Sequence, residues 1–341
     1  MRSVVCRGNI EERPALKEDD MEVLFGPYGG RSLEYAERFS GCGANAVWFH
    51  GFNPSAFETC EKHGIAACVE FSTFRADFNK RPELIPTGPD GNPIRFGSRV
   101  QGVCLSRKEF LQEIEEELVQ GVSRFRPTGI WLDYLTSAGW FETPEPDLQE
   151  SCFCEKCIKE FCEHTGVDAD DPELILSAYK EEWHRFTCER IAKLAARYAE
   201  IIRDNITDCT IGAYMCPWTP FEFDGALTGI FGQDYNLLSP SVDLFTPLIY
   251  AKKCGSPPEW PRMFLEECRS FIPEDNEVQL ILDMLDFPES LFAAAESSVP
   301  SRGIQIFSGA QIFDKRETYE SFRKGVGRLH RRISCLHRRD R

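Results

Sequence analysis

Short apolar runs alternate with helical stretches along almost the whole chain, and this alternation constrains the fold more than any other feature. Eight runs have the length and composition of buried strands: residues 22–26, 45–50, 65–71, 129–134, 210–215, 244–250, 279–284 and 303–307. Segments with helical spacing lie between them: residues 32–40, 54–63, 107–124, 172–204 and 260–271. Such alternation is typical of βα units around a parallel sheet. The sequence therefore predicts an α/β protein.

Eight strands with intervening helices fit a (β/α)8 TIM barrel better than an open doubly wound sheet. No glycine-rich phosphate fingerprint opens any of the helices, which weakens a dinucleotide-binding interpretation. A length of 341 residues suits one barrel, and we see neither an internal repeat nor a linker. We expect residues 1–341 to form a single domain with long βα loops at 75–106 and 135–171, and loops of that length are usually functional.

The charge of the chain is acidic but unevenly distributed. A formal net charge of −16 argues against nucleic acid as a partner. Residues 323–341, however, contain eight Lys or Arg and one Asp, which predicts a basic C-terminal helix or tail. Such a tail is a solvated helix, a self-association contact in a homo-oligomer, or an anion-binding arm. No signal-like apolar segment or apolar run of eighteen residues occurs, so we expect a cytoplasmic protein that does not bind membranes.

Polar side chains end several of the predicted strands. Asp133 follows the apolar run of residues 129–132 and is the strongest candidate for a catalytic carboxylate, because barrel enzymes place catalytic groups at the C-terminal ends of strands. The structural alternative is an aspartate that caps the next turn. The other strand-end candidates are His50, Glu70, Tyr214, Tyr250 and Asp283. Each has a structural alternative as a hydrogen-bonding residue of the barrel rim.

Paired carboxylates with nearby aromatic rings are what cleavage of a glycosidic bond requires. One acid protonates the leaving oxygen, the other attacks the anomeric carbon or activates water, and rings stack on the C–H face of the sugar. Asp133, Glu70 and Asp283 are therefore our catalytic candidates. Aromatic residues crowd the loops that follow the strands: Phe71, Phe74, Trp140, Phe141, Trp218, Phe221 and Tyr235. With 12% aromatic residues, such clusters also arise without a functional reason.

The fifteen cysteines have no secretion signal beside them, and their odd number argues against a disulfide framework. Most are expected to be small buried hydrophobic residues, such as Cys42, Cys60, Cys68 and Cys188. One dense group has the spacing of metal ligands: Cys152, Cys154, Cys157 and Cys162.

Three interpretations of this group stay open: a structural zinc site, packed free thiols, and a local disulfide or redox pair. Cys162 also shares an apolar helical face with Ile158 and Phe161, so its alternative role is that of a core residue and not a metal ligand. Catalytic zinc is disfavoured, because no HExxH or similar motif accompanies the cysteines.

Three segments together resemble barrel-fold glycoside hydrolase families that are loosely related to α-amylase and α-galactosidase-like enzymes. They are Gly-Ile-Trp-Leu-Asp-Tyr at 129–134, Cys-Phe-Cys-x2-Cys-x3-Phe at 152–161, and Gly-Gln-Asp-Tyr at 232–235 followed by Asp243-x3-Pro247-x2-Tyr250. The resemblance covers residues 21–308. It implies a barrel in which Asp133, the acid that ends the fourth strand, is the nucleophile.

The chain departs from the pattern of these families at the later strands. The fifth strand ends Tyr214-Met215-Cys216-Pro217 without a carboxylate, and the sixth ends in Tyr250. The general acid therefore stays unassigned among four residues: Glu70, Glu222, Asp224 and Asp283.

We expect a glycoside hydrolase that cleaves O-glycosidic bonds of oligosaccharides or glycosides and needs no cofactor for catalysis, with zinc in a structural role only. The expected substrate-binding residues are His50, Trp140, Tyr214, Trp218, Asp234 and Tyr250. Two alternatives remain: a non-catalytic carbohydrate-binding or regulatory barrel, and a metal-dependent hydrolase that uses the cysteine cluster.

Overall fold

The computed structural model describes residues 23–94, 102–142 and 146–336. Its strands form one parallel sheet in the order β1-β9-β8-β6-β5-β4-β3-β2, with β7 beside β6. The strands are β1 (Leu24–Pro27), β2 (Ala46–His50), β3 (Ala66–Ser72), β4 (Gly129–Asp133), β5 (Thr210–Met215), β6 (Leu244–Ile249), β7 (Glu277–Val278), β8 (Leu280–Asp283) and β9 (Gly303–Phe307).

The sheet closes on itself to form the predicted barrel. β1 and β2 meet through a parallel bridge between Tyr28 and Trp48, and the Gly29 N–H donates to the Trp48 carbonyl at 2.8 Å. β7 and β8 together act as one strand of the barrel, because both pair with β6 and only Gln279 separates them. Counted in this way, eight strands surround the barrel axis, as the sequence predicted. Glu22 of the first predicted strand lies outside the described residues.

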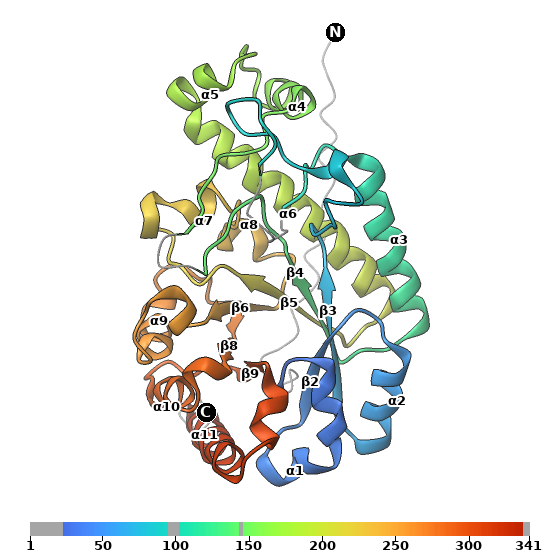
Figure 1. Cartoon of the computed structure of the whole chain (residues 1–341), viewed down its shortest axis with the longest axis vertical. Coiled ribbons are helices and arrows are strands. Elements are labelled where there is room, and N and C mark those ends of the chain that lie inside the picture. The colour runs from blue at the N-terminus through green and yellow to red at the C-terminus, as the bar shows by residue number, and fades with distance from the viewer. Residues whose placement is uncertain (1–22, 95–101, 143–145, 337–341) are drawn as a thin grey trace.

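Helices surround the barrel (Figure 1). The longer ones are α2 (Pro54–His63), α3 (Lys108–Arg124), α4 (Glu155–Thr165), α5 (Pro172–Ala178), α6 (Lys180–Asn205), α9 (Trp260–Cys268), α10 (Glu289–Glu296) and α11 (Arg316–Leu336). Shorter α-helical turns are α1 (Phe39–Cys42), α7 (Ala226–Gly229) and α8 (Tyr235–Leu238). The 3-10 helices are η1 (Gly30–Arg38), η2 (Pro82–Leu84), η3 (Glu222–Asp224), η4 (Lys252–Cys254), η5 (Met284–Asp286) and η6 (Gly309–Phe313).

The helical segments follow local signals in the sequence. The Asn53 side chain caps α2 by accepting from the Ser55 and Ala56 N–H groups, and Gly64 ends it in a left-handed conformation. The segment predicted as one helix at 172–204 is divided at Tyr179 into α5 and α6, because Tyr179 leaves helical geometry (φ −134°, ψ 27°). The predicted basic tail belongs to α11 up to residue 336, and residues 337–341 lie outside the described part.

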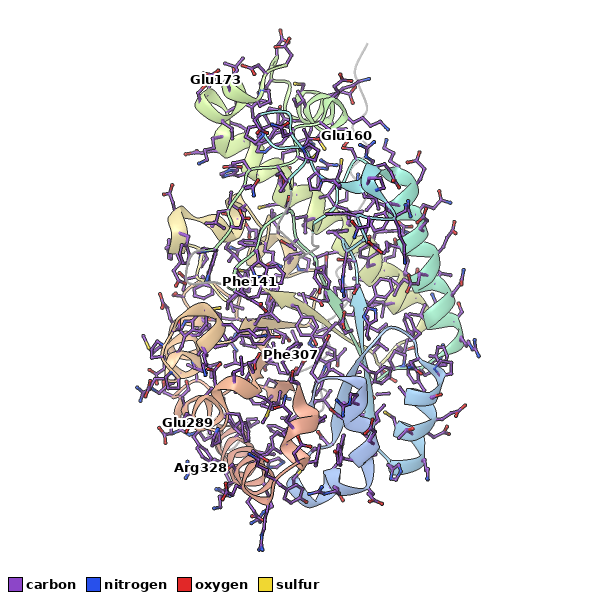
Figure 2. The ribbon with its side chains drawn as sticks, in the orientation of Figure 1. Phe141, Glu160, Glu173, Glu289, Phe307 and Arg328 are labelled. Carbon is purple, nitrogen blue, oxygen red and sulfur yellow. The ribbon has the colours of Figure 1, made fainter. Side chains whose placement is uncertain are left out.

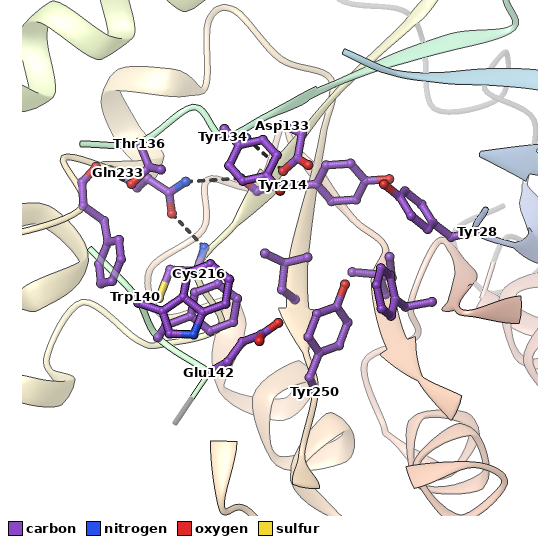
Figure 3. Close-up of a pocket in the computed structure, with 15 residues that line it drawn as sticks. Tyr28, Asp133, Tyr134, Thr136, Trp140, Glu142, Tyr214, Cys216, Gln233 and Tyr250 are labelled. Carbon is purple, nitrogen blue, oxygen red and sulfur yellow. Dashed lines mark hydrogen bonds between the residues drawn. The ribbon is translucent and has the colours of Figure 1, made fainter. Parts of the chain in front are cut away.

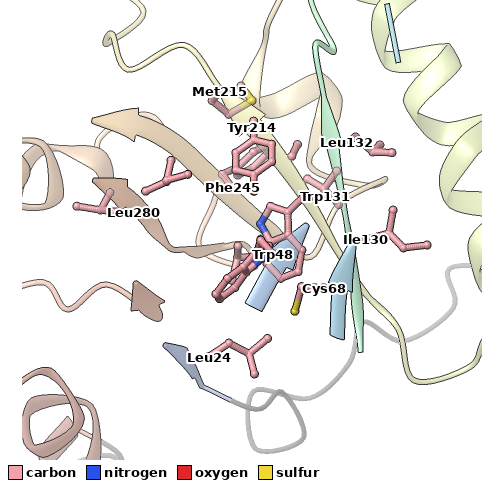
Figure 4. Close-up of a cluster of buried hydrophobic side chains, with 14 of the residues drawn as sticks. Leu24, Trp48, Cys68, Ile130, Trp131, Leu132, Tyr214, Met215, Phe245 and Leu280 are labelled. Carbon is pink, nitrogen blue, oxygen red and sulfur yellow. The ribbon is translucent and has the colours of Figure 1, made fainter. Parts of the chain in front are cut away.

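Aliphatic and aromatic side chains pack together in the buried cluster of Figure 4, with Trp48 and Trp131 near its centre. The indoles of Trp48 and Trp131 meet edge to face with their centroids 5.3 Å apart, and Trp131 Nε1 donates to Thr246 Oγ1 at 2.8 Å. The Trp131 ring lies against the backbone of β5, where Gly212 leaves room for it.

Gly212→Ala is expected to lower the free energy of unfolding by about 1–3 kcal/mol, because the added methyl group overlaps the Trp131 indole in a filled barrel. Urea denaturation measures this loss. Gly30→Ala is the matched control, since its new Cβ meets open space. Equal losses in the two variants would contradict the close packing of Trp131 on β5.

The described residues contain two extensive hydrophobic clusters, and a third that consists only of Ile94 and Ala138 with Trp140 packed against them. The large one fills the barrel and the space beneath its helices, while a smaller one joins α4, α5 and α6 around Phe161, Trp183 and Phe186. The smaller cluster forms the upper lobe of Figure 1, beyond the C-terminal ends of β3 and β4. Among the helices that the structure describes, none has both the length and the apolar character needed to cross a membrane.

Candidate functional site

A cavity of about 210 Å³ opens at the C-terminal ends of the strands (Figure 3). Its walls are largely aromatic, and the lining residues are Tyr28, Asp133, Tyr134, Thr136, Trp140, Phe141, Glu142, Tyr214, Cys216, Phe231, Gln233, Leu248, Tyr250, Ile281 and Phe307. This is the end of a barrel at which enzymes carry out their chemistry. Two carboxyl groups, those of Asp133 and Glu142, line the same space.

Asp133 lies at the last position of β4, half-buried, with its side chain turned to the cavity. Its Oδ1 accepts from the N–H of Tyr134 at 2.8 Å, and Tyr134 adopts a left-handed conformation (φ 54°) that non-glycine residues rarely take. Burial, and then the negative charge of Glu70, raise the pKa of Asp133 well above its usual range. Both effects favour the protonated form of Asp133.

Glu70 does not line the cavity. It is only 3% exposed in β3, and three side chains surround its carboxylate. Ser72 Oγ donates to Oε1 at 3.0 Å, His50 Nδ1 lies 3.1 Å from the same oxygen, and the Tyr28 hydroxyl donates to Oε2. Burial opposes the charge, but the hydrogen bonds of His50, Tyr28 and Ser72 outweigh it, so the pKa of Glu70 lies below its usual value.

Asp283 is also buried behind the wall of the cavity, where it pairs with a lysine. Lys253 Nζ lies 2.8 Å from Asp283 Oδ2 and 3.6 Å from Glu142 Oε1, so one ammonium group joins both carboxylates. The same nitrogen lies 4.6 Å from the ring centroids of Tyr250 and Phe307, which adds a cation–π contact. Glu142 thus faces the cavity with its charge balanced from behind.

The other predicted residues divide into two groups. Trp140, Tyr214 and Tyr250 line the cavity. His50, Trp218 and Asp234 are absent from its wall: His50 is mostly exposed at the end of β2, Trp218 packs behind Phe231 with ring centroids 5.5 Å apart, and Asp234 caps α8 by accepting from the Asn236 and Leu237 N–H groups.

Two polar residues of the wall, Glu142 and Gln233, were not expected from the sequence. Gln233 is buried, and it fixes the backbone of the wall by accepting from the Cys216 N–H at 2.7 Å and donating to the carbonyls of Leu135 and Tyr214 at 3.2 Å each. Gln233 stands in the Gly-Gln-Asp-Tyr segment that carried the resemblance, directly before Asp234, so a signal existed. Glu142 follows Trp140 and Phe141 in a loop and had no periodic signal.

A four-cysteine cluster lies apart from the cavity, and it consists of Cys104, Cys152, Cys154 and Cys157. All four sulfur atoms lie within 4.8 Å of one another, and the Cys104 sulfur is 3.6 Å from that of Cys154 and 3.7 Å from that of Cys157. Thiolates held tetrahedrally at about 2.3 Å from a zinc ion would have their sulfurs about 3.8 Å apart. The cluster therefore fits a metal ion such as zinc.

The membership of this cluster differs from the expected set. Cys162 lies outside it, because its thiol donates to the carbonyl of Ala169 at 3.0 Å. Cys104, from the loop before α3, provides the fourth sulfur, and none of the four forms a disulfide. Cys42, Cys60, Cys68 and Cys188 are buried, as expected.

Polar side chains surround Cys157 on the side of α6. Ser106 Oγ lies 3.0 Å from the Cys157 sulfur, and Arg190 Nη1 donates to that sulfur at 3.6 Å. Arg190 also pairs with Glu160 at 3.0 Å. Figure 2 shows Glu160 in the upper lobe, well separated from Phe141 and Phe307 at the cavity.

No family model matches the sequence, and no curated protein matches it. Solved structures do match. A β-galactosidase from the Antarctic haloarchaeon Halorubrum lacusprofundi has a TM-score of 0.63 at 12% identity, over 89% of this chain and 57% of that one. The glycoside hydrolase domain of PgaB (BpsB) from Bordetella bronchiseptica has a TM-score of 0.66 at 10% identity, over 89% of this chain and 98% of that domain. An α-amylase from Lactobacillus plantarum has a TM-score of 0.51 at 11% identity, over 89% of this chain and 78% of the amylase.

These comparisons concern the fold. The chain spans just over half the length of the β-galactosidase that it matches. At 10–12% identity the likeness shows a shared barrel, and it confirms the resemblance to barrel-fold glycoside hydrolases at that level.

Proposed function

We propose that this chain is a glycoside hydrolase that cleaves O-glycosidic bonds of oligosaccharides or glycosides. One observation carries the proposal: Asp133 and Glu142 open into the same aromatic-walled cavity at the C-terminal mouth of the barrel. Two carboxyl groups on one cavity are the minimum that this reaction needs. The barrel shared with glycoside hydrolases supports the proposal.

We assign the general acid to Asp133, because burial and the charge of Glu70 raise its pKa and favour its protonated form. Glu142, paired with Lys253, is then the carboxylate that attacks the anomeric carbon or activates water. This assignment differs from the nucleophilic Asp133 that the resemblance implied. Glu70 and Asp283 support the pair from behind the wall, Glu70 through its charge and Asp283 by holding Lys253.

The aromatic wall is the proposed carbohydrate site. Trp140, Tyr214 and Tyr250 offer flat rings to the C–H face of a sugar, and the tyrosine hydroxyls offer hydrogen bonds to its hydroxyl groups.

We further propose that the cysteine cluster holds a structural zinc ion. Four thiolates close the coordination sphere, whereas a catalytic zinc keeps a position open for water or substrate. This donor set disfavours the alternative of a metal-dependent hydrolase that acts through the cysteines.

The test is a panel of 4-nitrophenyl glycosides and oligosaccharides, which includes the β-galactoside because β-galactosidases share the barrel. We expect release of nitrophenol or reducing sugar from at least one member, and a loss of about 10²–10⁴-fold in kcat for Glu142→Gln. Glu155→Gln, at an exposed position in the first turn of α4, is the control and should keep full activity. Binding of a sugar without turnover would favour the non-catalytic carbohydrate-binding barrel instead.

A further inference from the structure

Glu70 connects the outer rim of the barrel with the cavity. On one side it contacts His50, whose side chain is 65% exposed to solvent at the end of β2. On the other it accepts from the hydroxyl of Tyr28, which lines the cavity. His50 and Glu70 are register partners on neighbouring strands, as are Ser72 and Asp133. The order of the strands therefore places a solvent-facing imidazole, a buried carboxylate and the proposed acid in sequence.

Glu70 and Asp133 act on each other directly. Ser72, which donates to Glu70 Oε1 at 3.0 Å, is the register partner of Asp133, so both carboxyl groups lie beside it at the ends of β3 and β4. Glu70 raises the pKa of Asp133 and so favours its protonated form. Two carboxyl groups in such contact share one proton, because both cannot be ionised at low cost. His50, Tyr28 and Ser72 stabilise the charge on Glu70, which favours Asp133 as the carrier of the shared proton.

We propose that His50 and Glu70 form a proton relay from solvent that reloads Asp133 after each turnover. The relay rests on the proposed function, in which Asp133 gives its proton to the glycosidic oxygen. The imidazolium of His50 then gives its Nδ1 proton to Glu70, Glu70 passes a proton to the Asp133 carboxylate, and His50 takes a new proton from water. Glu142, acting as the base, takes a proton from the attacking water and releases it to solvent, so one proton enters through His50 for each proton that Glu142 returns.

The charges around His50 favour its role as donor. Its hydrogen bond with Glu70 is the main cause that raises its pKa, and burial opposes the rise. Glu117 on α3 adds to the rise, whereas Arg75, which follows β3, opposes it. The raised pKa enlarges the fraction of protonated His50 at neutral pH.

The first experiment needs no substrate: a pH titration of the full chain labelled with [13C]histidine, followed by NMR. We expect the pKa of His50 to lie above its ordinary value of 6.5 and to fall in Glu70→Gln, which removes the main cause of the rise. A second inflection of the His50 signal at higher pH should report ionisation of Asp133 and disappear in Asp133→Asn. Titration of His50 at its ordinary value in both the wild type and Glu70→Gln would overturn the relay.

The second experiment compares two glycosides of one sugar that the panel identifies as cleaved, one with a phenyl and one with a 2,4-dinitrophenyl leaving group. In His50→Gln, kcat for the phenyl glycoside should fall about 10-fold. The kcat for the dinitrophenyl glycoside should be unaffected, because dinitrophenolate leaves without protonation. His63→Gln, exposed at the end of α2, is the control and should match the wild type on both.

The outcomes separate the relay from the proposed function. Wild-type turnover of both glycosides by His50→Gln overturns the relay and leaves the hydrolase intact. A linked titration of His50 and Asp133 in a protein that cleaves no glycoside supports the proton connection and overturns the hydrolase.

Discussion

Asp133→Asn is expected to lower kcat about 10³-fold on any glycoside that the wild type cleaves. Asparagine has nearly the same shape and its side-chain oxygen can still accept from the Tyr134 N–H, so the fold should persist. It cannot, however, donate an acidic proton to a leaving group. Steady-state kinetics with a thermal melt of each variant separates the two effects.

The dependence of the rate on pH should also report the protonation of Asp133. Because burial and Glu70 raise the pKa of Asp133, the rate should fall as the pH rises through that pKa, at a higher pH than an ordinary aspartic acid would give. Glu70→Gln removes the neighbouring charge, so this alkaline limb should move to lower pH. Asp168→Asn, at an exposed position after α4, should change neither kcat nor the profile. Full turnover by Asp133→Asn would remove Asp133 from the mechanism.

If the cluster holds zinc as proposed, Cys154→Ser is expected to lose the ion and to lower the melting temperature by roughly 10 °C or more, because structural zinc contributes many kcal/mol to folding. Elemental analysis of the purified protein and differential scanning calorimetry measure the two effects.

Cys162→Ser is the matched control on the same side of the lobe. Its thiol contacts the Ala169 carbonyl and not the cluster, so the variant should keep its zinc and nearly all of its stability. Zinc loss in Cys162→Ser but not in Cys104→Ser would contradict the ligand set and favour the four residues expected from local spacing.

The strands could be predicted because their signals are local. The run Gly129–Asp133 is apolar for three residues after its glycine and ends on a carboxylate, which predicted both β4 and the place of Asp133 at the mouth. The same rule predicted Tyr214 and Tyr250 on the cavity wall. It did not predict that Glu70 is closed off behind the wall, because that depends on Tyr28, which follows β1 and lies 42 residues before Glu70 in the sequence.

The positions of loop residues were harder to predict, because they too depend on contacts between segments that are distant in the sequence. The path that brings Glu142 to the cavity depends on contacts such as Thr136 Oγ1 with the Phe231 carbonyl at 3.0 Å, and on the Trp140–Asp147 bridge. Cys104 joins the cluster from fifty residues before Cys154, so no local spacing could reveal it. Trp218 shows the converse: an aromatic loop residue that packs behind the wall and does not line it.

The segment between β4 and α4 belongs to both sites, since it carries Trp140 and Glu142 at the cavity and then Cys152 and Cys154 at the cluster. Under the proposed function, a chelator would therefore behave as an inhibitor although the metal never meets the sugar. The inhibition would develop slowly, at the rate at which the ion leaves, and added substrate would not compete with it. Zinc supply would then set how much of the protein is competent.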